Sequence, residues 1–274
     1  MSAHQFGAWD DYFIPGTDVL RNKFTSPTQS FGVTAPTVLA RLEIVFVAKR
    51  LAQLEQSPLP GRFDYAHMQA IHRYLFQDVY EWAGEPRRGP ETSMVKRGPN
   101  VLDPRDPNMV TYAYYPGNDE MNRAAEARYA ELASDNYLRG LDREPFVNRL
   151  AEHWGELNVI HTFREGNTRS QFVFFSQLVE EAGYHLDGRR FAAVDPETQR
   201  EMIRAGQPNL RDAFVNARFY SQATGRNDRL AQVLDAALQV QPRALRAQLD
   251  QLTDRRRGPE SGRRPEPPSR RPIR

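Results

Sequence analysis

The stretch His161-Thr-Phe-Arg-Glu-Gly-Asn-Thr-Arg169 joins two apolar segments of helical spacing. The segment before it carries apolar residues three or four positions apart, at Phe146, Leu150, Trp154, Leu157 and Ile160. The segment after it repeats this spacing over 172–182 and stops at Gly183, a residue that favours helix ends. The sequence therefore predicts two buried helices joined by a polar, glycine-containing turn.

This turn has the chemistry of an anion site. The first N–H groups of the second helix lack intrahelical partners and lie at the positive end of the helix dipole. Gly166 permits the close approach that a phosphate needs. Asn167 or Thr168 can cap the helix, and Thr168 with Gln171 fits a capping box. Because the dipole disfavours a cation in the first turn, an anionic ligand explains Arg169 better than helix stability does.

Two further residues of the turn indicate group-transfer chemistry. Glu165 places a carboxylate beside the anion site, suited to holding Mg²⁺ against phosphate oxygens. His161, with a pKa expected near neutrality, is a candidate to accept the proton of an attacking hydroxyl. Taken singly, each residue fits a capped turn with polar surface residues; together, within nine positions, they favour a site.

The rest of the body predicts mostly helix, over 36–55, 65–82, 119–136 and 229–239. The stretch 83–116 differs, with six prolines, three glycines and two short candidate strands at 92–95 and 110–115. This composition predicts an extended loop or hairpin. Such a long irregular insert in a helical domain is usually functional or disordered.

Composition excludes several classes of protein. The 274 residues hold no cysteine, which removes disulfides, cysteine zinc sites and thiol catalysis. No apolar run approaches the eighteen residues of a membrane span, and the first residues carry no export signal, so we expect no membrane contact and a cytoplasmic location. His67, His72 and His153 form no recognisable metal motif and are interpreted as structural residues.

Charge separates the tail from the body. Residues 255–274 hold eight arginines, two glutamates and five prolines, so this segment carries +6 and the remainder carries −4. With few apolar side chains to bury, the tail is predicted to be disordered from about residue 255. It could hold nucleic acid weakly, although a solubilising extension is the preferred interpretation.

The turn resembles the signature of the Fic family, His-x-Phe-x-(Asp/Glu)-Gly-Asn-(Gly/Lys)-Arg-x-x-Arg. The segments Tyr12-Phe-Ile-Pro-Gly-Thr-Asp-Val-Leu-Arg-Asn-Lys23 and Ile71-His-Arg-Tyr-Leu-Phe-Gln-Asp-Val-Tyr-Glu-Trp-Ala-Gly-Glu-Pro-Arg87 are also similar to bacterial members, and the likeness covers about residues 9–240. It implies an all-α Fic fold over 1–240 with a β-hairpin flap at about 84–116, followed by an extension over 241–274.

The resemblance also implies an activity, the transfer of AMP from ATP to a protein hydroxyl with Mg²⁺. His161 would be the general base and Glu165 the Mg²⁺ ligand. Phe163 would pack the loop against the core. The predicted nucleotide-binding residues are Arg164, Gly166, Asn167, Thr168 and Arg169. Within the flap, the predicted contacts with a target protein are Ser93, Met94, Val95 and Lys96.

Two positions depart from the family pattern. Thr168 replaces the usual Gly or Lys, and Phe172 replaces the second Arg, which in the family orients the γ-phosphate for AMP transfer. Relatives that lack this Arg resemble kinases in activity. The alternatives are therefore a kinase that uses the same site, or a catalytically weak target-binding module; Arg164 and Lys96 are candidates to replace the missing cation.

Regulation follows the same resemblance. The internal inhibitory motif of many Fic proteins, Ser/Thr-x-x-x-Glu-Gly/Asn, has no match in this sequence. Its absence favours a toxin-like enzyme restrained by a small separate antitoxin. However, the inhibitory Glu of that subgroup pairs with the second Arg, so Phe172 weakens this expectation.

Overall fold

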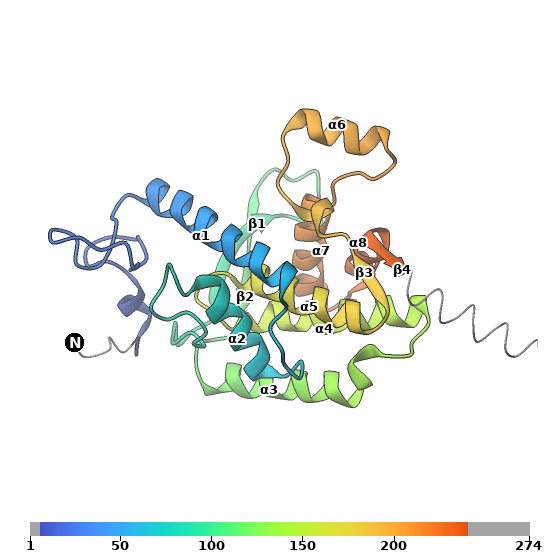
Figure 1. The fold of residues 1–274 in the computed structure, drawn as a ribbon, viewed down its shortest axis with the longest axis horizontal. Coiled ribbons are helices and arrows are strands. Elements are labelled where there is room, and N and C mark those ends of the chain that lie inside the picture. Colours follow the sequence, from blue (N-terminus) through green and yellow to red (C-terminus); the bar gives the residue numbers. More distant parts are fainter. Residues whose placement is uncertain (1–5, 241–274) are drawn as a thin grey trace, which may run out of the picture.

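A computed structural model describes residues 6–240, and the disorder predicted from about residue 255 lies outside the described residues. Figure 1 shows a mostly helical body, as predicted, with two small sheets, of which only the hairpin was expected. The α-helices are α1 (Pro36–Gln56), α2 (Tyr65–Phe76), α3 (Asp119–Ser134), α4 (Arg143–Ile160), α5 (Asn167–Glu181), α6 (Pro196–Arg204), α7 (Arg211–Thr224) and α8 (Asp228–Ala237). The strands are β1 (Met94–Pro99), β2 (Met109–Tyr114), β3 (Tyr184–Leu186) and β4 (Leu238–Val240), with short 3₁₀ helices at Trp9–Tyr12, Asn136–Leu138 and Gly188–Phe191.

Helix α4 is the centre of the fold. It contacts α3, α5, α7 and α8, and it is buried along most of its length because apolar residues occupy nearly every face. Trp154, on its inner side, is fully buried and stacks on Phe175 of α5 at 4.6 Å between ring centroids. The two helices predicted on either side of the polar turn are therefore confirmed as the core pair.

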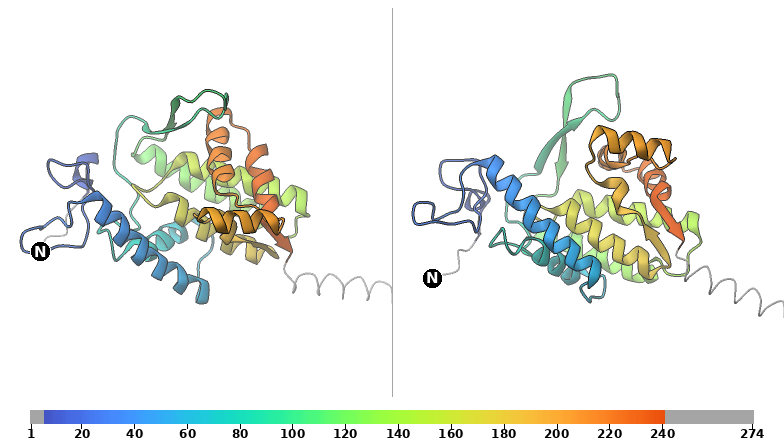
Figure 2. Two further views of the ribbon diagram at one scale, coloured as in Figure 1. Left: turned by 90° about the horizontal axis from the view of Figure 1, so that it is seen from above. Right: turned by 45° about the horizontal axis from the view of Figure 1, so that its top comes forward.

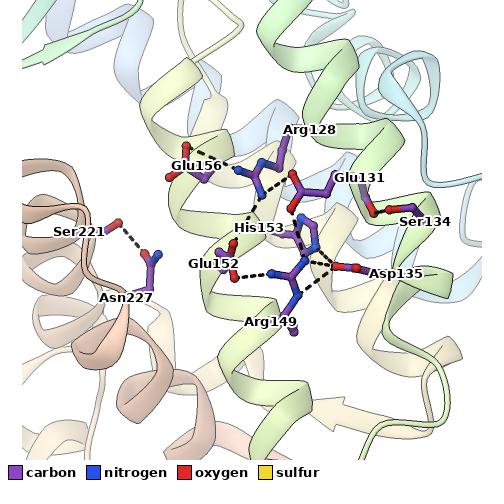
Figure 3. Close-up of polar contacts among 10 residues, drawn as sticks. All are labelled: Arg128, Glu131, Ser134, Asp135, Arg149, Glu152, His153, Glu156, Ser221 and Asn227. Atoms are coloured by element: carbon purple, nitrogen blue, oxygen red, sulfur yellow. Dashed lines mark hydrogen bonds and ion pairs between the residues drawn. The ribbon is translucent and has the colours of Figure 1, made fainter.

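Gly155 lets α4 approach the C-terminal helices closely. A Cβ at this position would lie 2.3 Å from the Asn227 side chain and 2.7 Å from the Ser221 hydroxyl. These two side chains hydrogen-bond to each other beside α4 (Figure 3). The missing side chain thus allows α7 and the start of α8 to pack against the helix that ends at His161.

An ion-pair network joins α3 to α4 on the opposite side (Figure 3). Arg149 contacts Asp135 and Glu152, and the Nε2 atom of His153 lies 2.8 Å from Asp135. His153 is fully buried, and burial is the main cause that lowers its pKa. This histidine belongs to the core of the protein, in agreement with the prediction that it is a structural residue.

The predicted hairpin is present. β1 and β2 pair in antiparallel register, with Met94 opposite Tyr114 and Pro99 opposite Met109. Figure 2 shows the hairpin projecting from the helical body, with its base near the turn between α4 and α5. β1 begins at Met94, two residues later than expected, and runs to Pro99. Helix α7 supports the hairpin, since Tyr112 stacks on Phe219 with ring centroids 4.3 Å apart.

The helix predicted over 65–82 is too long, because α2 ends at Phe76. The N-terminal segment takes over the next carbonyl groups: the Lys23 side chain donates to the Gln77 carbonyl at 2.8 Å, and its backbone N–H donates to that of Val79 at 2.8 Å. These tertiary contacts replace the helical hydrogen bonds that local spacing suggested.

Helices α6 and α7 and the β3–β4 pair were not predicted from the sequence. Helix α7 buries Phe214, Ala217 and Tyr220, which lie three residues apart. This spacing is typical of a helix and is present in the sequence. Within residues 6–240, no helix combines the length and the apolar composition that crossing a bilayer requires.

Candidate active site

His161 lies where α4 ends. It adopts a left-handed backbone conformation (φ 51°, ψ 60°) that turns the chain out of the helix, and its side chain is buried, with the residue 2% exposed. The Nδ1 atom lies 3.2 Å from the Asn158 carbonyl. Because a carbonyl only accepts hydrogen bonds, Nδ1 carries the proton and Nε2 keeps its lone pair. The buried Nε2 atom has no partner among the described residues, so it can accept a proton from a ligand.

The expectation of a near-neutral pKa for His161 is wrong. Burial, followed by the positive charge of Lys96, lowers the pKa of His161 well below its usual value. The charges of Arg87 and Arg218 act in the same direction. The imidazole is therefore neutral at pH 7, and several cations surround it.

A buried arginine fixes the position of His161. Arg87, 1% exposed, donates from Nε to the His161 carbonyl at 2.9 Å and from Nη1 to the Gly89 carbonyl at 3.0 Å. Its Nη2 atom donates to the Tyr115 carbonyl, at the end of β2. One guanidinium thus ties the end of α4 to both arms of the hairpin. This role of Arg87 could not be predicted from the sequence, because its three acceptors, at positions 89, 115 and 161, lie far from one another in the chain.

The turn after His161 is closed by Asn167. Its Oδ1 atom accepts from the Phe163 N–H at 2.9 Å, and its Nδ2 atom donates to the Phe163 carbonyl. The Phe163 ring in turn stacks on His72 at 3.8 Å, which packs the loop against the core as expected. Since the Asn167 side chain holds the loop together, its backbone N–H is the group left for a ligand.

Gly166 is the residue before α5 and has a φ of 81°. A Cβ there would lie 2.3 Å from the ring of Phe76, so only glycine fits. The capping box predicted from Thr168 and Gln171 is wrong: no side chain caps α5, and Gln171 donates instead to the Leu157 carbonyl at 3.0 Å. The first N–H groups of α5 are consequently available to an anion.

Glu165 presents its carboxylate at the edge of this loop, with its side chain 41% exposed. Its Oε1 atom accepts from the Gly166 N–H at 2.9 Å and lies 3.6 Å from the Arg169 guanidinium. No group of three or more His, Cys, Asp or Glu side chains placed to hold a metal occurs in residues 6–240. A single carboxylate that completes its shell with phosphate oxygens and water fits Mg²⁺, which binds in this way in many nucleotide sites.

Arg169 lies in the first turn of α5, as predicted, but it has a carboxylate partner. Its Nη2 atom lies 2.7 Å from Glu43 of α1, and its guanidinium sits 4.7 Å over the ring of Phe76. The Tyr80 hydroxyl also donates to Glu43. The sequence could not indicate this pair, since 126 positions separate its members in the chain.

The two remaining predicted nucleotide-binding residues, Arg164 and Thr168, contact different parts of the protein. Arg164 places its guanidinium 4.2 Å over the Trp9 ring and 5.0 Å from Phe13, against the N-terminal segment. Thr168 accepts a hydrogen bond at 2.9 Å from Arg218 of α7, a residue that no local sequence signal indicates.

The four predicted flap residues occupy the start of the hairpin. Met94 is buried, whereas Ser93, Val95 and Lys96 are exposed, and Ser93 precedes the strand. The Lys96 ammonium lies 5.8 Å over the ring of Tyr114, which is itself 4.3 Å from the His161 ring. The end of the hairpin next to the helical body therefore lies beside His161, the candidate proton acceptor. A segment held along β1 would lie near this histidine.

Comparison with known families agrees with this geometry. A model of the Fic/DOC family matches residues 62–179, which include α2, the hairpin, α4 and most of α5.

Curated relatives extend the likeness beyond the family model. The chain is 34% identical over 215 residues to the protein adenylyltransferase VbhT of Bartonella schoenbuchensis, covering 76% of this chain and 39% of that protein. It is 36% identical over 180 residues to the probable protein adenylyltransferase y4lH of Sinorhizobium fredii, covering 65% of this chain and 79% of the relative. The chain thus spans less than half of VbhT and most of y4lH.

A solved structure supports the fold. The BepC protein of Bartonella tribocorum, a VirB-translocated effector crystallised with AMPPNP, superposes with a TM-score of 0.64 at 21% identity. The match covers 85% of this chain and 98% of that one.

Proposed function

This chain belongs to the Fic/DOC family, and we propose that it is a protein adenylyltransferase that moves AMP from ATP to a hydroxyl side chain of a target protein. The observation that carries the proposal is the unpartnered, proton-free Nε2 of His161 beside the open N-terminus of α5. A base and an anion site lie together, as transfer of a phosphorus group to a hydroxyl requires.

The phosphates of ATP would bind at the start of α5. Backbone N–H groups from Asn167 onward point out of the helix end, and Gly166 leaves room for close approach. Arg169 would contribute positive charge after exchanging its contact with Glu43 for a phosphate oxygen. Arg164 packs against Trp9, so we assign it to support of the loop.

Glu165 is the residue that would hold Mg²⁺, with phosphate oxygens and water as the other ligands. The bound ion would neutralise charge on the phosphates. This assignment agrees with the exposure of the carboxylate and with the use of only Oε1 in its contacts within the protein.

The proton of the target hydroxyl would pass to His161. The lowered pKa of His161 makes it a weak base in the free protein, because Lys96 and the neighbouring arginines disfavour a second positive charge. A bound polyphosphate would offset these cations and raise the pKa of His161. Substrate binding would therefore prepare the base for the reaction.

The hairpin would dock the target. Ser93, Val95 and Lys96 are exposed at the start of β1, which pairs on one side with β2. An extended target segment could add to the free side through main-chain hydrogen bonds. Its side-chain hydroxyl would then lie beside Tyr114 and His161.

The test uses the chain with Mg²⁺ and ATP labelled at either the α- or the γ-phosphate, in bacterial lysate, together with His161→Ala. We expect label from the α-position on a protein band, and its loss in the variant. Melting curves and ATP titrations of both proteins show whether the variant keeps its fold and its nucleotide. Unchanged labelling by a folded His161→Ala would contradict the role of His161.

The same experiment separates the alternatives. Label only from the γ-phosphate would indicate a kinase, the activity that Phe172 suggests by replacing the second arginine of the family motif. No label from either position and no ATP binding would favour a target-binding module. A toxin-like role, a small antitoxin and a cytoplasmic location stay predictions, as does weak binding of nucleic acid by the basic tail.

A further inference from the structure

Arg218 of α7 is a cation without a carboxylate partner among the described residues. It is partly buried, and its buried Nε atom has no hydrogen-bond partner within residues 6–240. Burial lowers the pKa of Arg218 to about 10; the Tyr114 phenol opposes this shift, but no carboxylate of residues 6–240 does. A desolvated charge without a counter-charge is costly, and proteins keep one mainly where a ligand or partner supplies the opposite charge.

The guanidinium lies beside the candidate nucleotide site. Its Nη1 atom donates to the Thr168 hydroxyl at 2.9 Å, within the first turn of α5. Its charge also lowers the pKa of His161, the buried residue whose Nε2 has no partner. Arg218 therefore faces the N-terminal end of α5 from the side of α7. Arg169, in contrast, pairs with Glu43 on the side of α1.

Aromatic packing fixes this placement. The Arg218 guanidinium sits 5.0 Å over the ring of Phe214, one turn earlier on α7. Phe214 contacts Phe172 of α5, with ring centroids 6.3 Å apart. Phe172 also packs on Trp154 and Phe191, so its ring belongs to the same aromatic cluster. The arginine is thus held in place before any ligand binds.

The other cations near the loop are engaged elsewhere. Arg164, whose buried Nε also lacks a hydrogen-bond partner among residues 6–240, lies over the Trp9 and Phe13 rings of the N-terminal segment. Arg169 pairs with Glu43 and Glu165, and Arg87 donates to three backbone carbonyls. Lys96 is exposed on the hairpin, beside the proposed path of the target. Of the described arginines around this loop, Arg218 is the one directed at α5 with donors to spare.

We propose that Arg218 binds the β- and γ-phosphates of the nucleotide, with Thr168 orienting its guanidinium. This inference rests on the proposed function and adds a phosphate-binding residue from α7, outside the residues that match the family model. As AMP is transferred, negative charge develops on the departing pyrophosphate, and a fixed guanidinium stabilises that charge.

A structural role for Arg218 is the competing explanation, because the bond to Thr168 also joins α7 to α5. The two roles differ in their dependence on phosphate number. A residue that binds the outer phosphates discriminates ATP from AMP, whereas a residue that only joins two helices affects both ligands alike.

The test measures Mg²⁺-dependent binding of ATP and AMP by calorimetry, on the full chain carrying His161→Ala to prevent turnover. Arg218→Met, Arg218→Lys and the control Arg211→Met, an exposed arginine at the start of α7, are compared in this background. Melting temperatures of all variants report the fold.

We expect Arg218→Met to weaken ATP binding by about 10- to 100-fold, the usual loss of a charge-assisted contact, and AMP binding by less than about threefold. Arg218→Lys should retain part of the ATP affinity, and Arg211→Met should retain all of it. Equal effects on ATP and AMP, or no effect on either, would overturn the inference. If the folded parent chain bound no ATP at all, the proposed function itself would fail, so the two failures can be distinguished.

Discussion

Glu43 of α1 and Arg169 of α5 form an ion pair, with Oε1 and Nη2 2.7 Å apart. The Glu43 side chain is 14% exposed, and the Tyr80 hydroxyl donates to its other oxygen. The Glu43 carboxylate therefore pairs with Arg169, the arginine that the sequence predicts to bind the nucleotide. In the free protein Arg169 has a counter-charge, which phosphate would have to displace.

We predict that Glu43→Gln tightens ATP binding by about threefold to tenfold, because it removes a negative charge that competes with phosphate for Arg169. The amide can still accept from Tyr80, so the loss of stability should be about 1 kcal/mol. Titration calorimetry measures the affinity, and the exposed Glu55→Gln, on the same helix, is the control. Weaker ATP binding by Glu43→Gln would show that Glu43 orients Arg169 for the nucleotide.

Gly166 and Gly225 offer a matched pair of substitutions. Both have positive φ, 81° and 69°. A Cβ on Gly225 would touch nothing within 4 Å, whereas one on Gly166 would lie 2.3 Å from the fully buried Phe76. We expect Gly225→Ala to lower the free energy of unfolding by about 1 kcal/mol, the cost of a left-handed backbone. Gly166→Ala adds a steric clash and should cost about 3 kcal/mol.

Urea unfolding of the two glycine variants measures this difference. Because Gly166 immediately precedes α5 and the proposed phosphate site, its alanine variant should also lose ATP binding, and Gly225→Ala should keep it. Equal destabilisation by both substitutions would mean that the Phe76 ring moves aside, and that shape at this position does not fix the loop.

The central helices and the turn could be predicted from the sequence because their signals are local. The apolar stripe of α4 specifies a buried helix that ends at His161, and prolines and glycines mark the hairpin. The pKa of His161 could not be predicted, since Lys96 and Arg87, which help to lower it, come from the hairpin and its base. The partners of Arg169 and Thr168, Glu43 and Arg218, likewise come from distant helices.

Acid should destabilise the fold through buried histidines. His72 accepts the Gly84 N–H at Nδ1, 2.8 Å away, so its proton is on Nε2, which donates to the Glu165 carbonyl at 3.0 Å. Burial lowers the pKa of His72 to about 3, against about 6.5 in an unfolded chain. Between these values the unfolded state binds more protons. The contribution to stability is therefore complete above about pH 6.5 and declines as the pH falls below it.

We predict that the free energy of unfolding falls by about 1.4 kcal/mol per pH unit below 6.5 for His72 alone. His67 and His153, whose pKa values burial also lowers, add to this slope. Urea titrations at pH 7, 6 and 5 measure it. His72→Gln should be less stable at pH 7 but should lose less stability on acidification. An identical slope in the variant would contradict the assignment of a neutral, buried His72.

Substitutions at Phe172 test whether positions 172 and 218 lie at the same phosphate subsite. Its ring packs on Phe191 at 5.1 Å and Trp154 at 5.6 Å, so Phe172→Arg alone should lower the free energy of unfolding by about 2 kcal/mol. It should not tighten ATP binding, because Arg218 already supplies the charge nearby. In an Arg218→Met background, however, an arginine at 172 lies one turn after Thr168 on the same face of α5 and can replace the missing cation.

We therefore expect the double variant Phe172→Arg/Arg218→Met to bind ATP about tenfold more tightly than Arg218→Met, a coupling that a double-mutant cycle measures. Phe172→Leu in the same background is the control, since it removes the ring without adding charge. Calorimetry in the presence of His161→Ala gives the affinities. If the double variant binds ATP no better than this control, positions 172 and 218 serve different parts of the nucleotide, and the cation on α7 does not substitute for the arginine that the family motif places on α5.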